Sequence, residues 1–343
     1  MIGTNICFDP GTANLNIWVK GKGVVVSEPD IAAYDVQNGK ISAIGKKAYS
    51  MLGKNHDWID IVQPVKNGSV HDFQTMQNLL GYHIQKICGS KILKPNILVN
   101  VPAQATVVDK RNILDLATGA GASKICIAES PLAAAIGAGV DTESYEGIMV
   151  VDIGAGTTDI AIISRGTVCA SKCVKSGGDD VDESILNFLR RERETVTGKS
   201  TAERIKKQIG TLLPDGTEIA VPVYGKDAVT GNIKASEITS SVIRLCAEGI
   251  FKNISEEIRM LLESAQPEIS CDVFKNGIIF TGGGSNIPGL TEFFEKRLNI
   301  SAVRAENAQS CTINGMAILS EKPEILERNC YVYKTRQELG YDE

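Results

Sequence analysis

The chain has 343 residues, of which 43% are hydrophobic and 22% are charged, and its formal net charge at pH 7 is −5. This length allows two domains of ordinary globular composition, and no apolar run approaches the length of a membrane span. The acidic balance lacks the basic surface that nucleic-acid binding requires, so we expect no nucleic-acid partner. The nine cysteines include no C-x-x-C pair, and no signal peptide is recognisable, which together indicate a reducing cytosol.

The N-terminal stretch Ile6–Val19 predicts two apolar strands around a turn that contains Asp9, Gly11 and Thr12. The elements after it alternate between strand and helix, which favours a lobe with a mixed, mostly parallel sheet. The region from Gly21 to Val70 is less regular, and we interpret it as a small insertion in the first lobe. The expected strands are 24–26, 31–34, 41–44, 97–101 and 125–128, and the expected helices are 46–52, 73–87, 109–120 and one that starts at Pro131.

The stretch Met149–Ser164 repeats the N-terminal design, with two strands around Asp152 and the glycine-rich segment Gly154–Thr158. Glycines let the backbone turn tightly and point successive N–H groups at an anion. Asp152 ends a buried strand, where a carboxylate is costly unless it is paired or faces a cation. A single stretch of this kind is more often only a hairpin. Two of them predict a duplicated fold in which two loops grip one phosphate chain from opposite sides.

Two further features predict ligand-binding positions in the second half of the chain. A helix over Thr201–Ile209 places Glu203 and Lys206 on one face, although a surface ion pair of little energetic value would explain the same spacing. The strand Gly277–Phe280 runs into the glycine triplet 282–284, a pattern that favours an anion or ribose site. Other expected elements are helices over 181–193, 236–265 and after Pro288, and a weakly patterned strand at 218–224 that Pro222 interrupts.

Taken together, these motifs resemble those of the MreB-type bacterial actins, and the resemblance covers Ile6–Ala317 without a large gap. It implies an α/β, actin-like fold with two duplicated lobes around a nucleotide cleft, each with a mixed five-stranded sheet and a small insertion subdomain. Lobe I is expected over 1–140, with an insertion at about 32–71 and with 316–343 returning to it. Lobe II is expected over 141–315, with an insertion at about 180–235. The motifs that carry the resemblance are 9–14, 20–23, 28–29, 101–103, 131–139, 151–158, 177–179, 201–206 and 280–290.

The resemblance also implies the positions of ATP or ADP and of Mg²⁺. Asp9 and Asp152 would hold Mg²⁺ through water, which suits a small ion that dehydrates reluctantly. Thr157 is the remaining catalytic candidate. The residues expected to contact the nucleotide are Thr12, Ala13 and Asn14 in the first phosphate loop, Gly154, Ala155, Gly156 and Thr157 in the second, Glu203 and Lys206 at the ribose and adenine, and Gly283, Gly284 and Ser285 at the nucleoside.

Two positions depart from the pattern of the family. Pro10 stands where the family usually has Leu, and it stiffens the first phosphate loop. Ser130 stands where the family has the Glu that positions the water attacking the γ-phosphate. The neighbouring Glu129 should point elsewhere, and losing a positioned acid–base group typically costs about 10²–10⁴-fold in rate. We therefore expect ATP binding with weak hydrolysis at most.

The predicted function is that of an ATP-binding protein that polymerises into filaments along the inner face of the membrane and governs cell shape, with motility as a further role. Ile92 and Leu93, flanked by Lys91 and Lys94, fit interfacial binding to anionic lipid, although two such residues are as often simply tucked into a loop. Expected partners are other copies of the chain, the membrane, MreB paralogues and shape or motility proteins. The expected location is cytoplasmic and peripheral to the membrane.

Two other classes share this superfamily. A sugar or acetate kinase needs a catalytic carboxylate near the acceptor, and the matched loops supply none. A chaperone ATPase needs a substrate-binding domain, and none follows the tail at 321–343.

Overall fold

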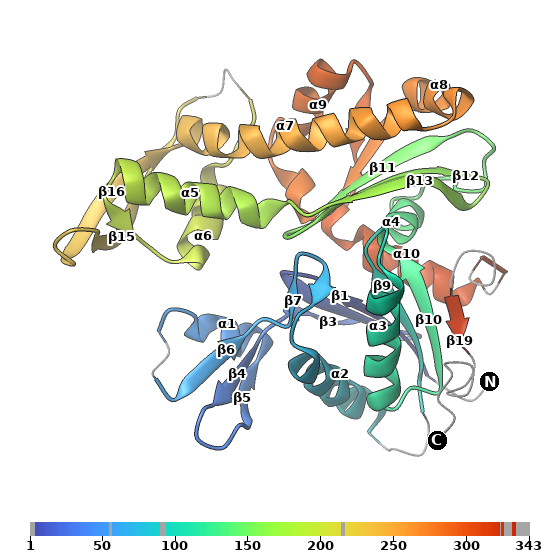
Figure 1. The fold of residues 1–343 in the computed structure, drawn as a ribbon, viewed down its shortest axis with the longest axis horizontal. Helices are drawn as coiled ribbons and strands as arrows, with labels where there is room; N and C mark the ends of the chain where they lie inside the picture. The colour runs from blue at the N-terminus through green and yellow to red at the C-terminus, as the bar shows by residue number, and fades with distance from the viewer. Residues whose placement is uncertain are drawn as a thin grey trace.

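The computed structural model describes residues 4–54, 57–89, 94–213, 217–322, 324–325 and 331–333. Two lobes of the same design make up this part of the chain (Figure 1). The strand order is β19-β10-β9-β1-β2-β3 in lobe I and β13-β12-β11-β17-β18 in lobe II. In both lobes the first strand pairs antiparallel with the second and parallel with a strand that follows an intervening helical region. The predicted duplication of two mixed α/β sheets is therefore confirmed.

Lobe I has one strand more than predicted, because β19 pairs antiparallel with β10 at the edge of the sheet. Helices α2 and α3 pack against each other beside this sheet, and α3 begins with a capping box between Thr106 and Asp109. The elements of the lobe are β1 (Asn5–Pro10), β2 (Asn14–Val19), β3 (Gly23–Pro29), α2 (Phe73–Cys88), β9 (Asn96–Val101), α3 (Val107–Gly119), β10 (Lys124–Glu129) and β19 (Tyr331–Tyr333). Between β3 and α2 lie β4 (Ala32–Asp35), β5 (Ile41–Ile44), α1 (Gly45–Met51), β6 (Ile59–Val62) and the short hairpin of β7 (Val65–Lys66) and β8 (Ser69–Val70).

Lobe II buries the larger apolar core, in which strands β11 and β12 are buried along almost their whole length. Its elements are β11 (Ile148–Ile153), β12 (Thr158–Ser164), β13 (Thr167–Val174), α5 (Gly178–Glu192), α7 (Ser240–Ser264), α8 (Pro267–Asn276), β17 (Ile278–Thr281), α9 (Leu290–Leu298) and β18 (Ala302–Arg304). Its second sheet and the adjoining helix comprise β14 (Thr195–Val196), α6 (Lys199–Ile209), β15 (Ala220–Asp227) and β16 (Ile233–Thr239).

Two helices join the lobes, and they cross between the two main sheets (Figure 1). Helix α4 (Ser130–Gly137) leads out of lobe I and packs on β11 and β12, whereas α10 (Cys311–Glu321) leads out of lobe II and packs on β1 and β2. Their backbones meet so closely that a Cβ atom on Gly315 would lie 1.7 Å from the carbonyl oxygen of Ala133. Glycine is therefore required where the two connecting helices cross.

Two predicted elements differ from the structure. The helix expected over 236–265 begins only at Ser240, because Ser236–Thr239 belong to β16 and pair with β15. The strand that Pro222 was expected to weaken is formed. Strand β15 pairs with β16 on one side, but on its other side β14 pairs only with Lys226 and Asp227, at the end of β15. Pro222 therefore lies where one edge of β15 has no neighbouring strand, and a missing N–H costs nothing there.

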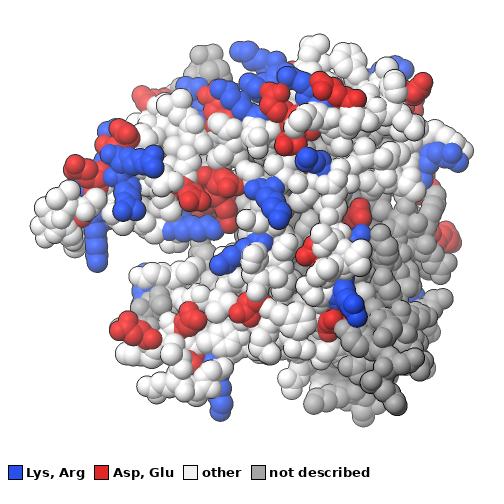
Figure 2. Space-filling model, viewed as in Figure 1, with Lys and Arg blue, Asp and Glu red and all other residues white. Residues whose placement is uncertain are grey.

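Both lobes extend into smaller subdomains on the same side of the molecule. The insertion of lobe I consists of β4, β5, β6 and α1, and the insertion of lobe II consists of β14, β15, β16 and α6. On the face shown in Figure 2, Lys and Arg are interspersed with Asp and Glu, and the surface is hollowed between the two insertions. No helix in the described part of the chain is both long enough and apolar enough to cross a membrane.

Candidate functional site

A cavity of about 770 Å³ lies between the two lobes, and both lobes supply its walls. This volume falls within the range of small-molecule sites. It is lined by the turn after β1, the β7–β8 hairpin and the ends of β9 and β10 from lobe I, and by the turn after β11, α5, α6 and the loop after β17 from lobe II. The cavity therefore opens where the strands of both sheets end, at the centre of the duplicated fold.

Two glycine turns face each other across this cavity. In the first turn, residues 10–14, the Gly11 N–H donates to the carbonyl oxygen of Asn14 at 3.0 Å; in the second turn, residues 153–158, Gly154 donates to Thr157 at 2.8 Å. The same hydrogen bond thus closes both turns. A Cβ atom on Gly156 would lie 2.8 Å from Thr12 Oγ1, so the second turn reaches the first only because that position is glycine.

The two carboxylates that the sequence predicted beside the glycine turns, Asp9 and Asp152, both line the cavity. The donors on Asp9 are the side-chain amides of Asn100 at 2.9 Å and Asn16 at 3.2 Å. The donors on Asp152 are hydroxyl groups, of which that of Thr281 is nearest at 3.0 Å. Burial raises the pKa of Asp9 and, with the charge of Asp9, raises the pKa of Asp152 to about 6. All these donors are neutral, so neither carboxylate has a cationic partner. Two buried carboxylates in one cavity without such a partner form an arrangement that a bound cation would stabilise.

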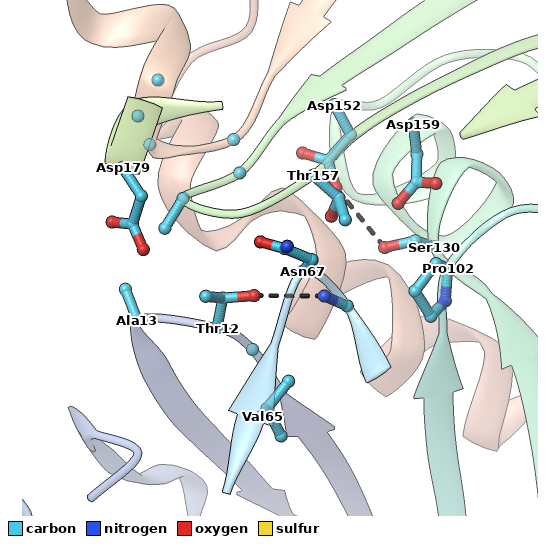
Figure 3. A pocket seen from close by; sticks show the side chains of 18 of the residues that line it. Thr12, Ala13, Val65, Asn67, Pro102, Ser130, Asp152, Thr157, Asp159 and Asp179 are labelled. Carbon is cyan, nitrogen blue, oxygen red and sulfur yellow. Dashed lines mark hydrogen bonds between the residues drawn. The ribbon is translucent and has the colours of Figure 1, made fainter. Parts of the chain in front are cut away.

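Ser130 begins α4 and lines the cavity, and in the view of Figure 3 it lies below and to the right of Asp152. Its hydroxyl accepts a hydrogen bond from Asn100 Nδ2 at 3.1 Å and donates to Asp152 Oδ2 at 3.4 Å. The side chain of Glu129 instead pairs with Lys110 Nζ at 3.3 Å. This agrees with the expectation that the carboxylate next to Ser130 points elsewhere.

Two parts of the cavity were not predicted from the sequence. Asp159, which is cross-strand from Asp152, is 4% exposed and accepts the backbone N–H of Ala103 at 2.9 Å. Burial and the charge of Asp152 raise its pKa to about 7. Asp159 is the one ionisable residue of β12, a strand whose residues are all buried, and that isolated carboxylate was the available signal.

The β7–β8 hairpin forms the other unpredicted part, because its Asn67-Gly68 sequence indicates a turn but not a location. Gly68 N–H lies 3.3 Å from Thr12 Oγ1. A Cβ atom on Gly68 would lie 2.8 Å from Pro102 and 2.9 Å from Thr157. The tip of the hairpin is therefore wedged between the lobes beside the second glycine turn (Figure 3).

The opposite end of the cavity contains Glu203 and Lys206, which the helical spacing predicted to share one face of α6. Lys206 Nζ donates to the carbonyl oxygen of Gly178 at 2.6 Å and pairs with Asp182 Oδ2 at 2.9 Å. Burial raises the pKa of Asp182 to about 6 against the opposing effect of Lys206. Lys206 is thus held at the start of α5.

The remaining predicted nucleotide contacts fall into three groups. Thr12, Ala13, Asn14, Gly154, Ala155, Thr157, Gly283 and Gly284 line the cavity. Gly156 packs against the first turn. Ser285 is 2% exposed, and its hydroxyl donates to the carbonyl oxygen of Gly282 at 2.7 Å, so its side chain points into its own loop. Ile92 and Leu93, the predicted membrane contacts, lie outside the described residues.

Comparison with known proteins places this geometry in a family. The sequence model of the MreB/Mbl protein family matches residues 3–328. The cell shape-determining protein Mbl of Bacillus subtilis (strain 168) is 34% identical over 329 residues, which cover 96% of this chain and 99% of the relative. The cell shape-determining protein MreB of Escherichia coli (strain K12) is 35% identical over 321 residues, or 92% of each chain.

Solved structures agree with this result. The crystal structure of MreB5 of Spiroplasma citri bound to ADP superposes with a TM-score of 0.90 at 33% identity, covering 95% of this chain and 98% of the other. The AMPPNP-bound form of the same protein gives a TM-score of 0.91. A MamK double helical filament structure, at 21% identity and a TM-score of 0.78, shares the fold. The chain belongs to the MreB/Mbl family and has its actin-like fold.

Proposed function

We propose that this chain binds ATP and ADP with Mg²⁺ between its lobes and polymerises into membrane-associated filaments that determine cell shape. The observation that carries the proposal is the pair of matching glycine turns that face each other above Asp9 and Asp152. Related structures of MreB5 hold ADP and AMPPNP, and the curated relatives are cell shape-determining proteins. Family membership also argues against the small-molecule kinase.

The two turns and the loop after β17 would contact the nucleotide largely through backbone N–H groups, since glycine leaves the backbone open to an anion. Thr12, Ala13 and Asn14 would meet the phosphates from lobe I, and Gly154–Thr157 would meet them from lobe II. Glu203 and Lys206 would meet the ribose and adenine. Gly283 and Gly284 would lie beside the nucleoside, with Ser285 shaping their loop from within.

Asp9 and Asp152 would hold Mg²⁺ through water, and the ion would supply the positive charge that their neutral partners lack. The described residues contain no group of three or more His, Cys, Asp or Glu that could hold a metal ion alone. This fits an ion that keeps several waters and shares its remaining positions with phosphate oxygens. Asp152→Ala should therefore weaken Mg²⁺-dependent ATP binding in calorimetry, and equal affinity with and without Mg²⁺ in both proteins would refute the assignment.

Hydrolysis should be weak because the position beside Asp152 carries the hydroxyl of Ser130. A neutral hydroxyl can hold a water but is a poor proton acceptor near pH 7. Thr157 remains the other side chain near the phosphate positions. Slow hydrolysis would prolong the life of ATP-bound filaments, and MreB paralogues or shape and motility proteins would act on filaments of this kind.

Electron microscopy of the purified protein with ATP, with ADP and without nucleotide tests the proposal directly. We expect filaments with ATP and few or none without nucleotide. An assay of ADP formation with and without a panel of sugars and acetate separates the kinase alternative, because a kinase transfers the phosphoryl group to the acceptor and leaves ADP. Product formation that depends on one of these acceptors, without filaments, would overturn the proposed function.

A further inference from the structure

One hydrogen bond joins the two insertions across the mouth of the cavity. Tyr49 lies on α1 in the insertion of lobe I, and its Oη donates to Glu203 Oε2 at 2.6 Å. Glu203 lies on α6 in the insertion of lobe II. The two residues are 154 positions apart, so this bond forms only when the lobes approach each other at this end.

The second oxygen of Glu203 has a different kind of partner. Lys207 Nζ contacts Glu203 Oε1 at 2.6 Å, one helical turn further along α6. The Lys207 side chain is 71% exposed, and an exposed ion pair of this spacing restrains a side chain only weakly. Tyr49 is therefore the contact that fixes the position of the Glu203 carboxylate.

The electrostatics of the pair keep the donor and the acceptor in their required forms. Burial raises the pKa of Glu203, but the hydrogen bonds from Lys207 and Tyr49 outweigh burial and lower it. Burial and the bond to Glu203 raise the pKa of Tyr49 above its ordinary value. A protonated phenol thus donates to an ionised carboxylate at every physiological pH.

Tyr49 does not line the central cavity. Glu203, Lys207 and Gln208 line both the cavity and a shallow outer hollow, whereas Tyr49 lines the hollow alone. Its ring packs against the small apolar core of its own insertion, which includes Ala48. Any effect of Tyr49 on a ligand in the cavity must therefore pass through Glu203.

We propose that Tyr49 is a positioning residue for ribose recognition, which holds the Glu203 carboxylate so that its free lone pairs accept the ribose hydroxyl groups. Two lone pairs remain available on Glu203 after the bonds from Tyr49 and Lys207. The inference rests on the proposed function, in which Glu203 meets the ribose. It adds that lobe I completes the ribose site of lobe II, so a nucleotide with ribose hydroxyl groups favours closure of the two insertions.

The test is Tyr49→Phe, which removes the hydroxyl and keeps the packed ring. The full chain would be loaded with ATP or with 2′,3′-dideoxy-ATP, which lacks both ribose hydroxyl groups. Dissociation of the nucleotide would then be measured by stopped flow, with a fluorescent nucleotide as competitor. Loss of one hydrogen bond to a charged group should accelerate ATP release by about tenfold or more. Release of dideoxy-ATP should change by less than about twofold, because no contact with Glu203 is lost.

Two controls make the result specific. Tyr145→Phe removes the hydroxyl of a tyrosine that is exposed before β11, and it should leave both rates unchanged. In a Glu203→Ala background, Tyr49→Phe should alter ATP release by less than about twofold, because the residue that it positions is gone.

Equal acceleration for ATP and dideoxy-ATP would overturn the inference, since Tyr49 would then act on closure alone. Unchanged ATP release in Tyr49→Phe, with wild-type ATP binding intact in calorimetry, would also overturn it and leave the proposed function standing. Absence of nucleotide binding by the wild-type chain would overturn the proposed function and this inference together.

Discussion

Asp30→Asn should stabilise the protein at neutral and alkaline pH. Asp30 is 1% exposed, it lies directly behind the first glycine turn, and neither of its side-chain oxygens has a hydrogen-bond partner. Its backbone N–H donates to the carbonyl oxygen of Ala13 at 3.1 Å. Burial, with a smaller contribution from the charge of Asp9, raises the pKa of Asp30 from 3.8 to about 7.

The sign of the effect follows from proton linkage. The unfolded chain releases the Asp30 proton near pH 3.8 and the folded chain near pH 7, so the ionisation of Asp30 costs no stability below pH 3.8, and its cost grows as the pH rises to 7. At 1.36 kcal/mol per pH unit, the loss is about 2 kcal/mol at pH 5 and about 4 kcal/mol at pH 8. Asn has nearly the same shape and no charge, so it removes this penalty.

Urea unfolding followed by circular dichroism at pH 5 and pH 8 measures the difference. The free energy of unfolding of Asp30→Asn should exceed that of the wild type by about 4 kcal/mol at pH 8 and by about 2 kcal/mol at pH 5. Asp60→Asn changes an exposed residue of β6 in the insertion of lobe I; it is the matched control and should change little at either pH. A gain that is the same at both pH values, or a loss at pH 8, would refute the reasoning.

Three further changes test other parts of the molecule. Ser130→Glu should raise phosphate release, by up to about 10²–10⁴-fold at equal polymer mass; no increase while ATP still binds would show that Ser130 is not the reason for slow hydrolysis. Replacing Ile92 and Leu93 with Ser should reduce co-sedimentation with anionic liposomes, since each aliphatic side chain contributes roughly 1.5–3 kcal/mol when buried, and equal pelleting would contradict a membrane role. Gly315→Ala should lower the free energy of unfolding by about 1–3 kcal/mol, because its Cβ would collide with the backbone of α4. Gly249→Ala, whose Cβ would meet nothing within 4 Å on α7, should instead be neutral or slightly stabilising, and an equal loss in both variants would contradict the packing argument.

Much of the cavity lining was predictable because its residues belong to local patterns. Asp9 and Asp152 each end a buried strand before a glycine turn, and a carboxylate in that place has few purposes apart from a cation or a partner. Glu203 and Lys206 share a helix face because they are separated by three residues. Asp159 and the tip of the β7–β8 hairpin were missed, since their positions beside the second turn depend on strands and loops far away in the chain.

The amino-acid sequence by itself determined the strands and the two glycine turns, which depend on spacing within about twenty residues. It also determined the duplicated design and the family, which follow when such local motifs are compared along the chain. Only the tertiary structure decided that Ser236–Thr239 pair as a strand, because their cross-strand contacts with β15 outweigh the helical pattern that follows them. Only the tertiary structure brought Tyr49 of one lobe to Glu203 of the other and left the buried carboxylate of Asp30 without a hydrogen-bond partner. Contacts of this kind depend on how segments far apart in the chain pack together, as the two lobes do around α4 and α10, and no local preference of the chain encodes that packing.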